Sequence, residues 1–107
     1  MDAPVLVYTT YPSLVEAEKA GRLIVEAGLA ACVNIVPEMV SIFRWKGQVE
    51  RGAEAIMIIK TRTSLQERVA AAVRESHPFE TPAILFLPTG GGDKVYVDWI
   101  MEETAGA

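Results

Sequence analysis

Two stretches of the chain share one pattern: residues 5–10 (VLVYTT) are followed by residues 13–16 (SLVE), and residues 55–61 (AIMIIKT) by residues 64–67 (SLQE). Each apolar run is typical of a β-strand. Each tetrapeptide is a capping box, in which a serine hydroxyl and a glutamate satisfy free amides at the start of a helix. A strand followed by a helix therefore occurs twice, and this repeat decides the fold class.

Each predicted helix carries one apolar stripe opposite its charged residues. The first helix is expected to end at Gly28, and the second before Pro78, which disfavours helical geometry at His77. Each helix therefore has one face to bury. The stripe residues are Leu14, Ala17, Gly21, Ile24 and Gly28 in the first helix, and Leu65, Val69, Ala72 and Val73 in the second.

Further strands are predicted after each helix and in a long hairpin between the two units. Residues 31–36, closing at Pro37, follow the first helix, and residues 83–87 follow the second. Residues 40–46 and 49–61 are expected to pair as a hairpin that turns between them. These strands complete two strand-helix-strand units.

The returning arm of this hairpin contains Gly52, which suggests a bulge or break. Near the C-terminus, Asp93 is expected to cap a short helix with Tyr96, Trp99 and Ile100 on one side. The resulting β-α-β-β-α-β order, with right-handed crossovers, predicts an α+β ferredoxin-like sandwich. In that fold a four-stranded antiparallel sheet carries two helices on one face.

The strand at residues 55–59 (AIMII) is apolar on alternate and on intervening positions. This pattern is typical of a strand buried on both sides. The two helices cover only one face of the sheet, and the short third helix is too small to cover the other. We therefore expect a homo-oligomer in which sheets face one another and the hairpin arm contacts a neighbouring copy.

The composition favours one compact domain over residues 1–107, since half of the residues are hydrophobic and the mean hydropathy is +0.23. Ten basic residues against fourteen acidic ones give a net charge of −4. No run of basic residues is present to neutralise phosphates, so neither nucleic acid nor an anionic membrane is an expected partner.

The cellular compartment is predicted from the cysteine count and from the first residues. Cys32 is the only cysteine, which excludes an internal disulfide and a CxxC site and fits a reducing compartment. The first residues (MDAP) contain no basic stretch, and no apolar run approaches the ~20 residues of a membrane span. A cytoplasmic protein is therefore expected.

Five segments together resemble the CutA family of divalent-cation tolerance proteins. They are residues 29–37 (LAACVNIVP), 41–47 (SIFRWKG), 60–61 (KT), 77–82 (HPFETP) and 96–99 (YVDW), in the family's order along nearly the whole chain. The resemblance implies a ferredoxin-like homotrimer, similar in architecture to the PII signalling proteins, with ligand clefts between subunits. It also implies a role in copper and cation tolerance, with PII-like regulation as a further option.

The metal-ligand positions that the resemblance implies are only partly kept. Metal-binding members of the family use the histidine of the His-Pro motif, a neighbouring histidine and a cysteine late in the first strand. These places hold His77, Ser76 and Tyr8 here. From the residues themselves, His77 with Glu80 or Cys32 is a candidate site for copper or zinc, completed by a neighbouring subunit. The alternative is that His77 only packs at a helix end.

Other candidates for ligand binding lie in the hairpin. Trp45 stands between Arg44 and Lys46, a combination that suits an anionic or planar small ligand, although a solvated turn has the same composition. Lys60 interrupts an apolar strand and requires a carboxylate partner or an opening to solvent. The resemblance places Lys60 and Thr61 near the loop of the His-Pro motif.

Several residues have a structural interpretation beside a functional one. Cys32 lies in an apolar strand, where it is expected in the core, but in a cleft it would be a soft copper ligand. The glycines at residues 90–92 favour a flexible connection over a phosphate site. Tyr96 and Trp99 are expected to pack against the core or another subunit.

The preferred hypothesis is a homotrimeric binding or regulatory protein. Its intersubunit clefts would take a divalent cation or a small ligand near Trp45, Lys60, Thr61, His77 and Glu80. One alternative is a structural trimer that anchors a protein partner. A small enzyme with His77 as general base is a further alternative, but no nucleophile stands beside an evident base, so no catalytic activity is expected.

Overall fold

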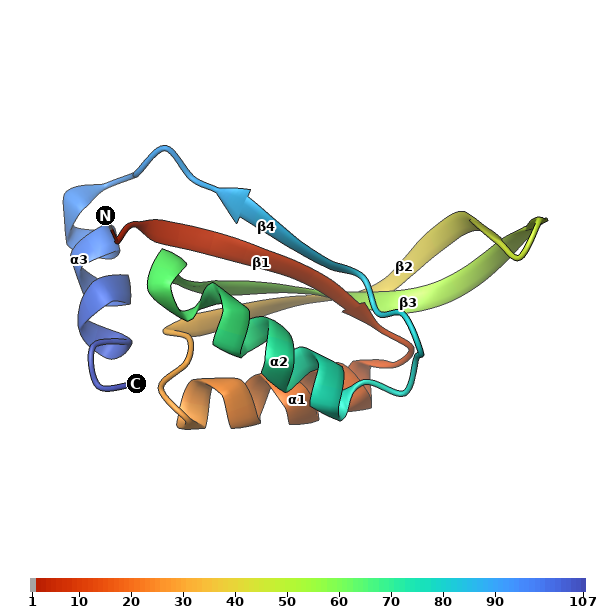
Figure 1. Ribbon diagram of the computed structural model, residues 1–107, viewed down its shortest axis with the longest axis horizontal. Coiled ribbons are helices and arrows are strands. Elements are labelled where there is room, and N and C mark those ends of the chain that lie inside the picture. Colours follow the sequence, from red (N-terminus) through yellow and green to blue (C-terminus); the bar gives the residue numbers. More distant parts are fainter. Residues whose placement is uncertain (1) are drawn as a thin grey trace.

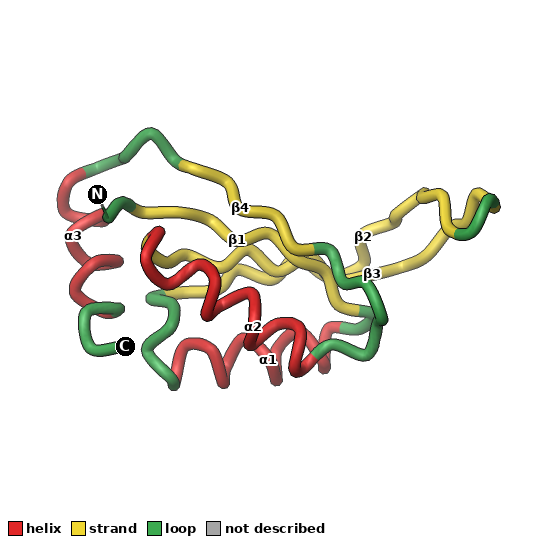
Figure 2. The backbone as a smooth tube through the Cα atoms, viewed as in Figure 1, coloured by secondary structure: helices red, strands yellow, loops and turns green. Residues whose placement is uncertain are grey.

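The computed structural model describes residues 2–107 and shows an α+β fold (Figure 1). One antiparallel sheet has the strand order β2-β3-β1-β4. Helices α1 and α2 lie side by side on one face of it, and α3 lies at one end (Figure 2). The predicted ferredoxin-like arrangement is confirmed. The elements are β1 (Pro4–Tyr11), α1 (Leu14–Glu26), β2 (Cys32–Trp45), β3 (Gln48–Arg62), the 3-10 turn η1 (Thr63–Leu65), α2 (Gln66–Ser76), β4 (Ile84–Pro88) and α3 (Lys94–Glu103).

Both ends of α1 follow the sequence prediction. The hydroxyl of Ser13 accepts a hydrogen bond from the amide of Glu16 at 3.2 Å, as a helix N-cap does. At the other end Gly28 adopts a positive φ of 73°, and the amide of Leu29 donates to the carbonyl of Ile24 at 3.1 Å. This is the glycine-terminated C-cap that the spacing predicts.

The start of α2 differs from the prediction, because Ser64 is not a helix cap. Its amide and hydroxyl donate instead to the carboxylate of Asp2, at 2.9 and 2.7 Å, and α2 begins only at Gln66 after the 3-10 turn. A carboxylate is a stronger acceptor than a hydroxyl at a free helix amide. These bonds, led by the one from the Ser64 amide, hold the pKa of Asp2 well below its usual range.

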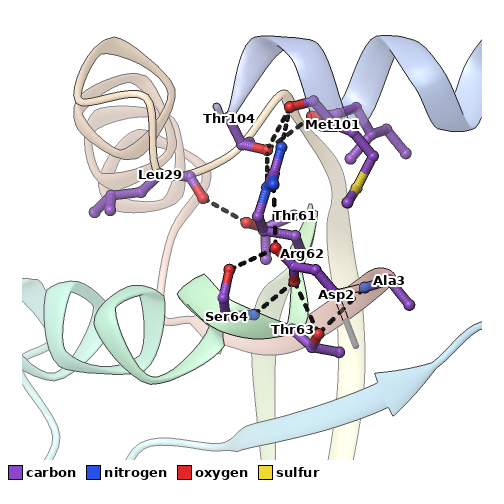
Figure 3. A network of polar contacts seen from close by, with 10 residues as sticks. Asp2, Ala3, Leu29, Thr61, Arg62, Thr63, Ser64, Met101 and Thr104 are labelled. Carbon is purple, nitrogen blue, oxygen red and sulfur yellow. Dashed lines mark hydrogen bonds and ion pairs between the residues drawn. The ribbon is translucent and has the colours of Figure 1, made fainter. Parts of the chain in front are cut away.

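Asp2 also belongs to a network that joins the N-terminal residues to α3 (Figure 3). Its carboxylate accepts from Nη1 of Arg62 at 3.1 Å and from the hydroxyl of Thr63 at 2.9 Å. The same guanidinium donates to the hydroxyl of Thr104 and to the carbonyl of Met101 in the last turns of α3. One arginine at the end of β3 therefore fixes α3 at this end of the sheet.

The core lies between the sheet and the two long helices. Gly21 brings α1 close to the sheet, since a Cβ there would lie 2.8 Å from Cγ2 of Val33 and 3.0 Å from Sδ of Met57. The helix-facing side chains alternate along β1 and β3 with the side chains of the opposite face. The buried core is made of Val7, Tyr11, Ala17, Ala20, Ile24, Ala30, Ala55, Met57, Ile59, Val69 and Val73.

The hairpin turns where it was predicted to turn. Lys46 and Gly47 both have positive φ, 49° and 81°, as a two-residue type I′ turn requires. Gly52 does not interrupt the returning strand, because it pairs in register with Ser41. The prediction of a bulge at Gly52 is therefore wrong.

The irregularity lies instead in β2, between Val36 and Met39. There Pro37 and Glu38, the latter with φ of 58°, stand opposite the single residue Ala55 and so form a bulge. The strand does not close at Pro37, as the proline had suggested, but continues to Trp45. The outer parts of β2 and β3 form an arm that extends beyond the helices (Figures 1 and 2).

The sheet face opposite α1 and α2 is apolar and has no helix over most of its area (Figure 1). Leu85 is 60% exposed and Leu87 42% exposed, and they pair in register with Tyr8 and Leu6 of β1. The two-sided apolar pattern of β3 therefore has only one side covered within the chain. No helix among residues 2–107 is long and apolar enough to cross a membrane.

Candidate functional site

A groove of about 740 Å³ lies between the β2–β3 arm and the loop that joins α2 to β4. The loop wall contains two prolines, Pro78 and Pro82, which restrict its backbone. Most of the side chains that the arm supplies lie on one face of both of its strands, and Ile42, at an alternating position, also lines the groove. The aromatic lining residues are Tyr8, Phe43, Trp45 and Phe79, and the carboxylates are Glu50, Glu54 and Glu80.

The arm places these side chains by simple alternation. In the register of the hairpin Phe43 pairs with Glu50, and Trp45 pairs with Gln48. Cross-strand partners lie on the same face of a sheet, so an aromatic ring and a carboxylate stand side by side on the groove wall. The groove is therefore both aromatic and acidic.

The charge of the groove differs from the expectation for the hairpin tip. No basic side chain is among the described residues that line it, whereas three glutamates are. Trp45 faces the groove, but its neighbours Arg44 and Lys46 do not line it, and Nζ of Lys46 lies 5.6 Å from the centroid of the Trp45 ring. Carboxylates in a cleft attract cations and repel anions, so the groove suits a cationic ligand rather than an anionic one.

His77 lies behind the loop wall, with both ring nitrogens in hydrogen bonds. Nδ1 accepts from the amide of Phe79 at 3.1 Å, so this nitrogen carries no proton. Nε2 then carries it and donates to the carbonyl of Thr10 at 2.6 Å. The ring stacks on Tyr11 with centroids 4.6 Å apart. The predicted end of α2 at His77 is confirmed, since His77 is extended at the helix C-cap.

Ser76 and Tyr8 occupy the two other positions at which the resemblance implies metal ligands. The Ser76 hydroxyl donates to the carbonyl of Val73 at 3.1 Å and lies 2.9 Å from the hydroxyl of Tyr11. Burial raises the pKa of Tyr11 above its ordinary value. Tyr8 lines the groove. Neither position supplies a nitrogen or sulfur ligand.

The side chains of one chain do not fit a tight copper or zinc site. Among residues 2–107 no three histidine, cysteine or acidic side chains come together around a common point. Cys32 pairs with Lys60 of β3, and Lys60 pairs with Leu6 of β1. His77 is bonded to Thr10, which lies four residues further along β1 than Leu6. Four residues of a strand span about 13 Å, so Cys32 and His77 are far apart within the chain.

Lys60 and Thr61 are also remote from the His77 loop within one chain. Nζ of Lys60 donates to the hydroxyl of Tyr96 at 2.8 Å, and this bond raises the pKa of Lys60. Of the two expectations for Lys60, a carboxylate partner and an opening to solvent, the first is not met within the chain, and the contact with Tyr96 is exposed. Thr61 is fully buried on the helix-facing side, where it donates to the carbonyl of Leu29 at 2.6 Å. The structure does not support a ligand contact by Thr61.

Sequence reasoning missed the two glutamates of the arm. Glu50 and Glu54 have the same parity in β3 as Ile56 and Ile58, which lie on the open sheet face. The period of two along a strand was therefore a usable signal for their placement. Phe79 lay within the HPFETP segment but was not singled out.

Comparison with known proteins gives the family. The profile described as "CutA1 divalent ion tolerance protein" matches residues 5–103. The chain belongs to this family. CutA of Thermus thermophilus is 39% identical over 99 residues, 92% of this chain and 96% of that protein. Its solved structure has a TM-score of 0.92 and covers 94% of this chain and 98% of that one. The resemblance seen in the sequence is thus confirmed.

Other CutA proteins show how varied the family is in length and location. Arabidopsis thaliana CutA, described as chloroplastic, is 39% identical over 100 residues, 94% of this chain but 55% of that protein. The chain spans about half the length of the plant and animal relatives it matches. The Archaeoglobus fulgidus structure, described as periplasmic, is 40% identical with a TM-score of 0.91, and covers 94% of this chain and 98% of that one. The predicted cytoplasmic location stays a prediction.

Proposed function

We propose that this CutA family member is a homotrimer that binds a cation in the groove beside the hairpin arm. The observation that carries the proposal is the lining itself, in which three carboxylates and four aromatic rings face one cavity and no described basic side chain does. Carboxylate oxygens suit hard divalent cations, and aromatic faces attract positive charge. A divalent metal ion is the simplest such ligand and agrees with the tolerance role of the family.

The donor set favours an ion held by oxygen over a tightly bound copper ion. Copper and zinc prefer nitrogen and sulfur ligands, and the candidate nitrogen ligand, His77, has both ring nitrogens engaged. The groove offers Glu50, Glu54 and Glu80, which do not converge on one point within a single chain. Their combined negative charge would attract the cation, and a neighbouring copy would complete its ligands. We therefore expect cation binding that depends on these glutamates.

The open sheet face supports the homo-oligomer. Its row of apolar side chains includes Leu85 and Leu87, both exposed in one chain. Contiguous exposed apolar surface of this kind is typical of a protein–protein interface. The family resemblance supplies the number three.

The two faces of the hairpin arm support contact between copies. One face carries Glu50 and Glu54 on the groove, whereas the alternating positions Arg44, Val49 and Arg51 belong to the other face and do not line it. A basic and apolar face complements an acidic and aromatic groove. Because the two surfaces differ, such a contact is head-to-tail, the type of contact that forms a ring when the rotation between copies closes, as in the proposed trimer.

A catalytic role receives no support from the site. A general base needs a free lone pair within reach of a substrate proton, and the lone pair of Nδ1 of His77 accepts the Phe79 amide proton. The family match is to divalent ion tolerance proteins rather than to a family of enzymes. We therefore propose a binding protein without catalytic activity.

Calorimetric titration of metal-stripped protein with Mn²⁺, Zn²⁺ and Cu²⁺ tests the proposed function. The double variant Glu54→Gln/Glu80→Gln keeps the shape of the groove but removes two charges. We expect saturable heat of binding for the natural chain. In the double variant the affinity for the cation should be at least about tenfold lower, which is about 1.4 kcal/mol in binding free energy. Glu103→Gln, at the exposed end of α3, is the matched control. Absence of saturable heat, or equal affinity in the double variant, contradicts the proposal.

A further inference from the structure

We propose that His77 is a positioning residue, which fixes the loop wall of the groove, and is not a metal ligand in this chain. The inference rests on the proposed function only in treating the groove as the binding site. Its basis is the position of the imidazole, which lies at the junction of β1, α2 and the loop from Pro78 to Ala83.

The hydrogen bonds assign the tautomer of the ring. A backbone amide only donates, so the amide of Phe79 at 3.1 Å requires an unprotonated Nδ1. The proton is therefore on Nε2, which donates to the carbonyl of Thr10 at 2.6 Å. No lone pair of this ring is left for a metal ion. A metal would have to displace either the Phe79 amide or the Nε2 proton with its acceptor.

The bond to Thr10 joins the loop to the middle of the sheet. The ladder between β1 and β4 ends at the pair Thr9–Ile84. His77 donates to the carbonyl of the next residue of β1, just beyond the last pair of the ladder. The hydrogen bond thus ties the loop wall to the central strand β1. It does so just beyond the point where β4, the strand that follows the loop, stops pairing with β1.

The ring is also held by two aromatic contacts. The centroid of Tyr11 lies 4.6 Å away, in a stacked arrangement, and the centroid of Phe79 lies 4.9 Å away, in a tilted one. Tyr11 is fully buried, whereas Phe79 is 45% exposed and lines the groove. His77 therefore connects a rigid core residue to a residue that forms the groove wall.

Two variants separate the two hydrogen bonds. In His77→Asn the side-chain oxygen can occupy the place of Nδ1 and accept the Phe79 amide. In His77→Gln the longer side chain can place its NH₂ group near Nε2 and donate to Thr10. We expect hydrogen exchange at the Phe79 amide to be slow in the natural chain and in His77→Asn. It should be at least about tenfold faster in His77→Gln, because this amide then has no acceptor. Equal exchange in all three proteins would overturn the inference.

The single histidine of the chain permits a direct spectroscopic test, which needs no variant to fold. In the ¹⁵N spectrum of protein labelled at histidine, we expect the Nε2–H tautomer and no change on addition of one equivalent of Zn²⁺ per chain. A stoichiometric shift of either ring nitrogen by Zn²⁺, or an Nδ1–H tautomer, would refute the positioning role. If the groove binds no cation at all, the proposed function fails, but the tautomer and the Phe79 exchange pattern stay as expected here.

Discussion

The phenol ring of Tyr11 and the imidazole of His77 are stacked, with centroids 4.6 Å apart and an angle of 27° between the ring planes. Tyr11 is the last residue of β1 and has no solvent exposure, whereas His77 begins the loop beside the groove. The stack therefore attaches the loop wall of the groove to the hydrophobic core. It also explains how one residue can align α2, β1 and the groove wall.

Tyr11 is expected to contribute to stability through both its ring and its hydroxyl. Tyr11→Phe keeps the stack but removes the hydrogen bond to Ser76, and should cost about 0.5–1.5 kcal/mol in the free energy of unfolding. Tyr11→Ala removes the buried ring and should cost about 3–5 kcal/mol. Urea unfolding measures both changes. Tyr8→Phe, on the half-buried open face, is the control, and an equal loss in that variant would argue against a special role of Tyr11.

Asp2 is expected to make stability depend on acidity. Its folded-state pKa is lowered, first by the Ser64 amide, so the folded protein favours the carboxylate. The stabilisation is complete above the unfolded-state pKa of an aspartate, about 3.9, and is lost as the pH falls below that value. The difference in unfolding free energy between the natural chain and Asp2→Asn should therefore shrink as the pH is lowered from neutral to 3.

The control for this experiment is Asp98→Asn. Asp98 forms a surface ion pair with Lys94, whose side chain is 87% exposed, and such pairs contribute little. A difference between the natural chain and Asp2→Asn that stays constant from pH 7 to pH 3 would show that the carboxylate charge of Asp2 is not what stabilises the network.

Gly21 is expected to be required for the approach of α1 to the sheet. Alanine would favour the helix by about 1 kcal/mol, but its Cβ would lie 2.8 Å from Cγ2 of Val33. Overpacking of this kind costs about 1–3 kcal/mol, so we expect a net loss of about 1 kcal/mol in thermal or urea unfolding. Gly106→Ala has no atom within 4 Å and should be neutral. A stabilised Gly21→Ala protein would contradict the close contact.

Leu85 is expected to lie in an interface between copies. Because its side chain is 60% exposed in one chain, Leu85→Glu should leave the fold of the chain intact but place a charge on the open sheet face. Sedimentation velocity should show a shift towards single chains, and the circular dichroism spectrum should keep its helix and strand content. Val15→Glu, at a 76% exposed position on α1, should not change the sedimentation. A Leu85→Glu protein with unchanged sedimentation would remove this face from the interface.

Local sequence signals predicted most of the fold. The cap at Ser13 and the glycine end at Gly28 need only neighbouring residues, and both are confirmed. The same serine signal was wrong at Ser64, because the acceptor that replaces it comes from Asp2, 62 residues away in sequence. The bulge was assigned to Gly52, although the chain places it beside Pro37 and Glu38, where a missing amide and a positive φ interrupt the ladder. Long-range partners and strand register are not contained in short windows.

The candidate site was predicted less completely than the fold. Trp45 and Glu80, two of the predicted binding residues, line the groove, and their role in binding stays a prediction. The side chains of Lys60 and Thr61 lie on opposite faces of the sheet. This was predictable, because successive side chains alternate along a strand. The engagement of both nitrogens of His77 was not predictable, because its two partners come from β1 and from the loop that follows Pro78. A motif identifies the residue but not the hydrogen bonds that occupy it.

The mass of the native protein in solution tests the central claim most directly, because the proposed homotrimer is what would cover the open sheet face and bring a neighbouring copy to the groove. Light scattering at micromolar concentration should give about three times the chain mass of 11.6 kDa. The thermal midpoint should also rise with protein concentration, as for any obligate oligomer. A single-chain mass of 11.6 kDa at that concentration would contradict the proposed trimer and its contacts between copies.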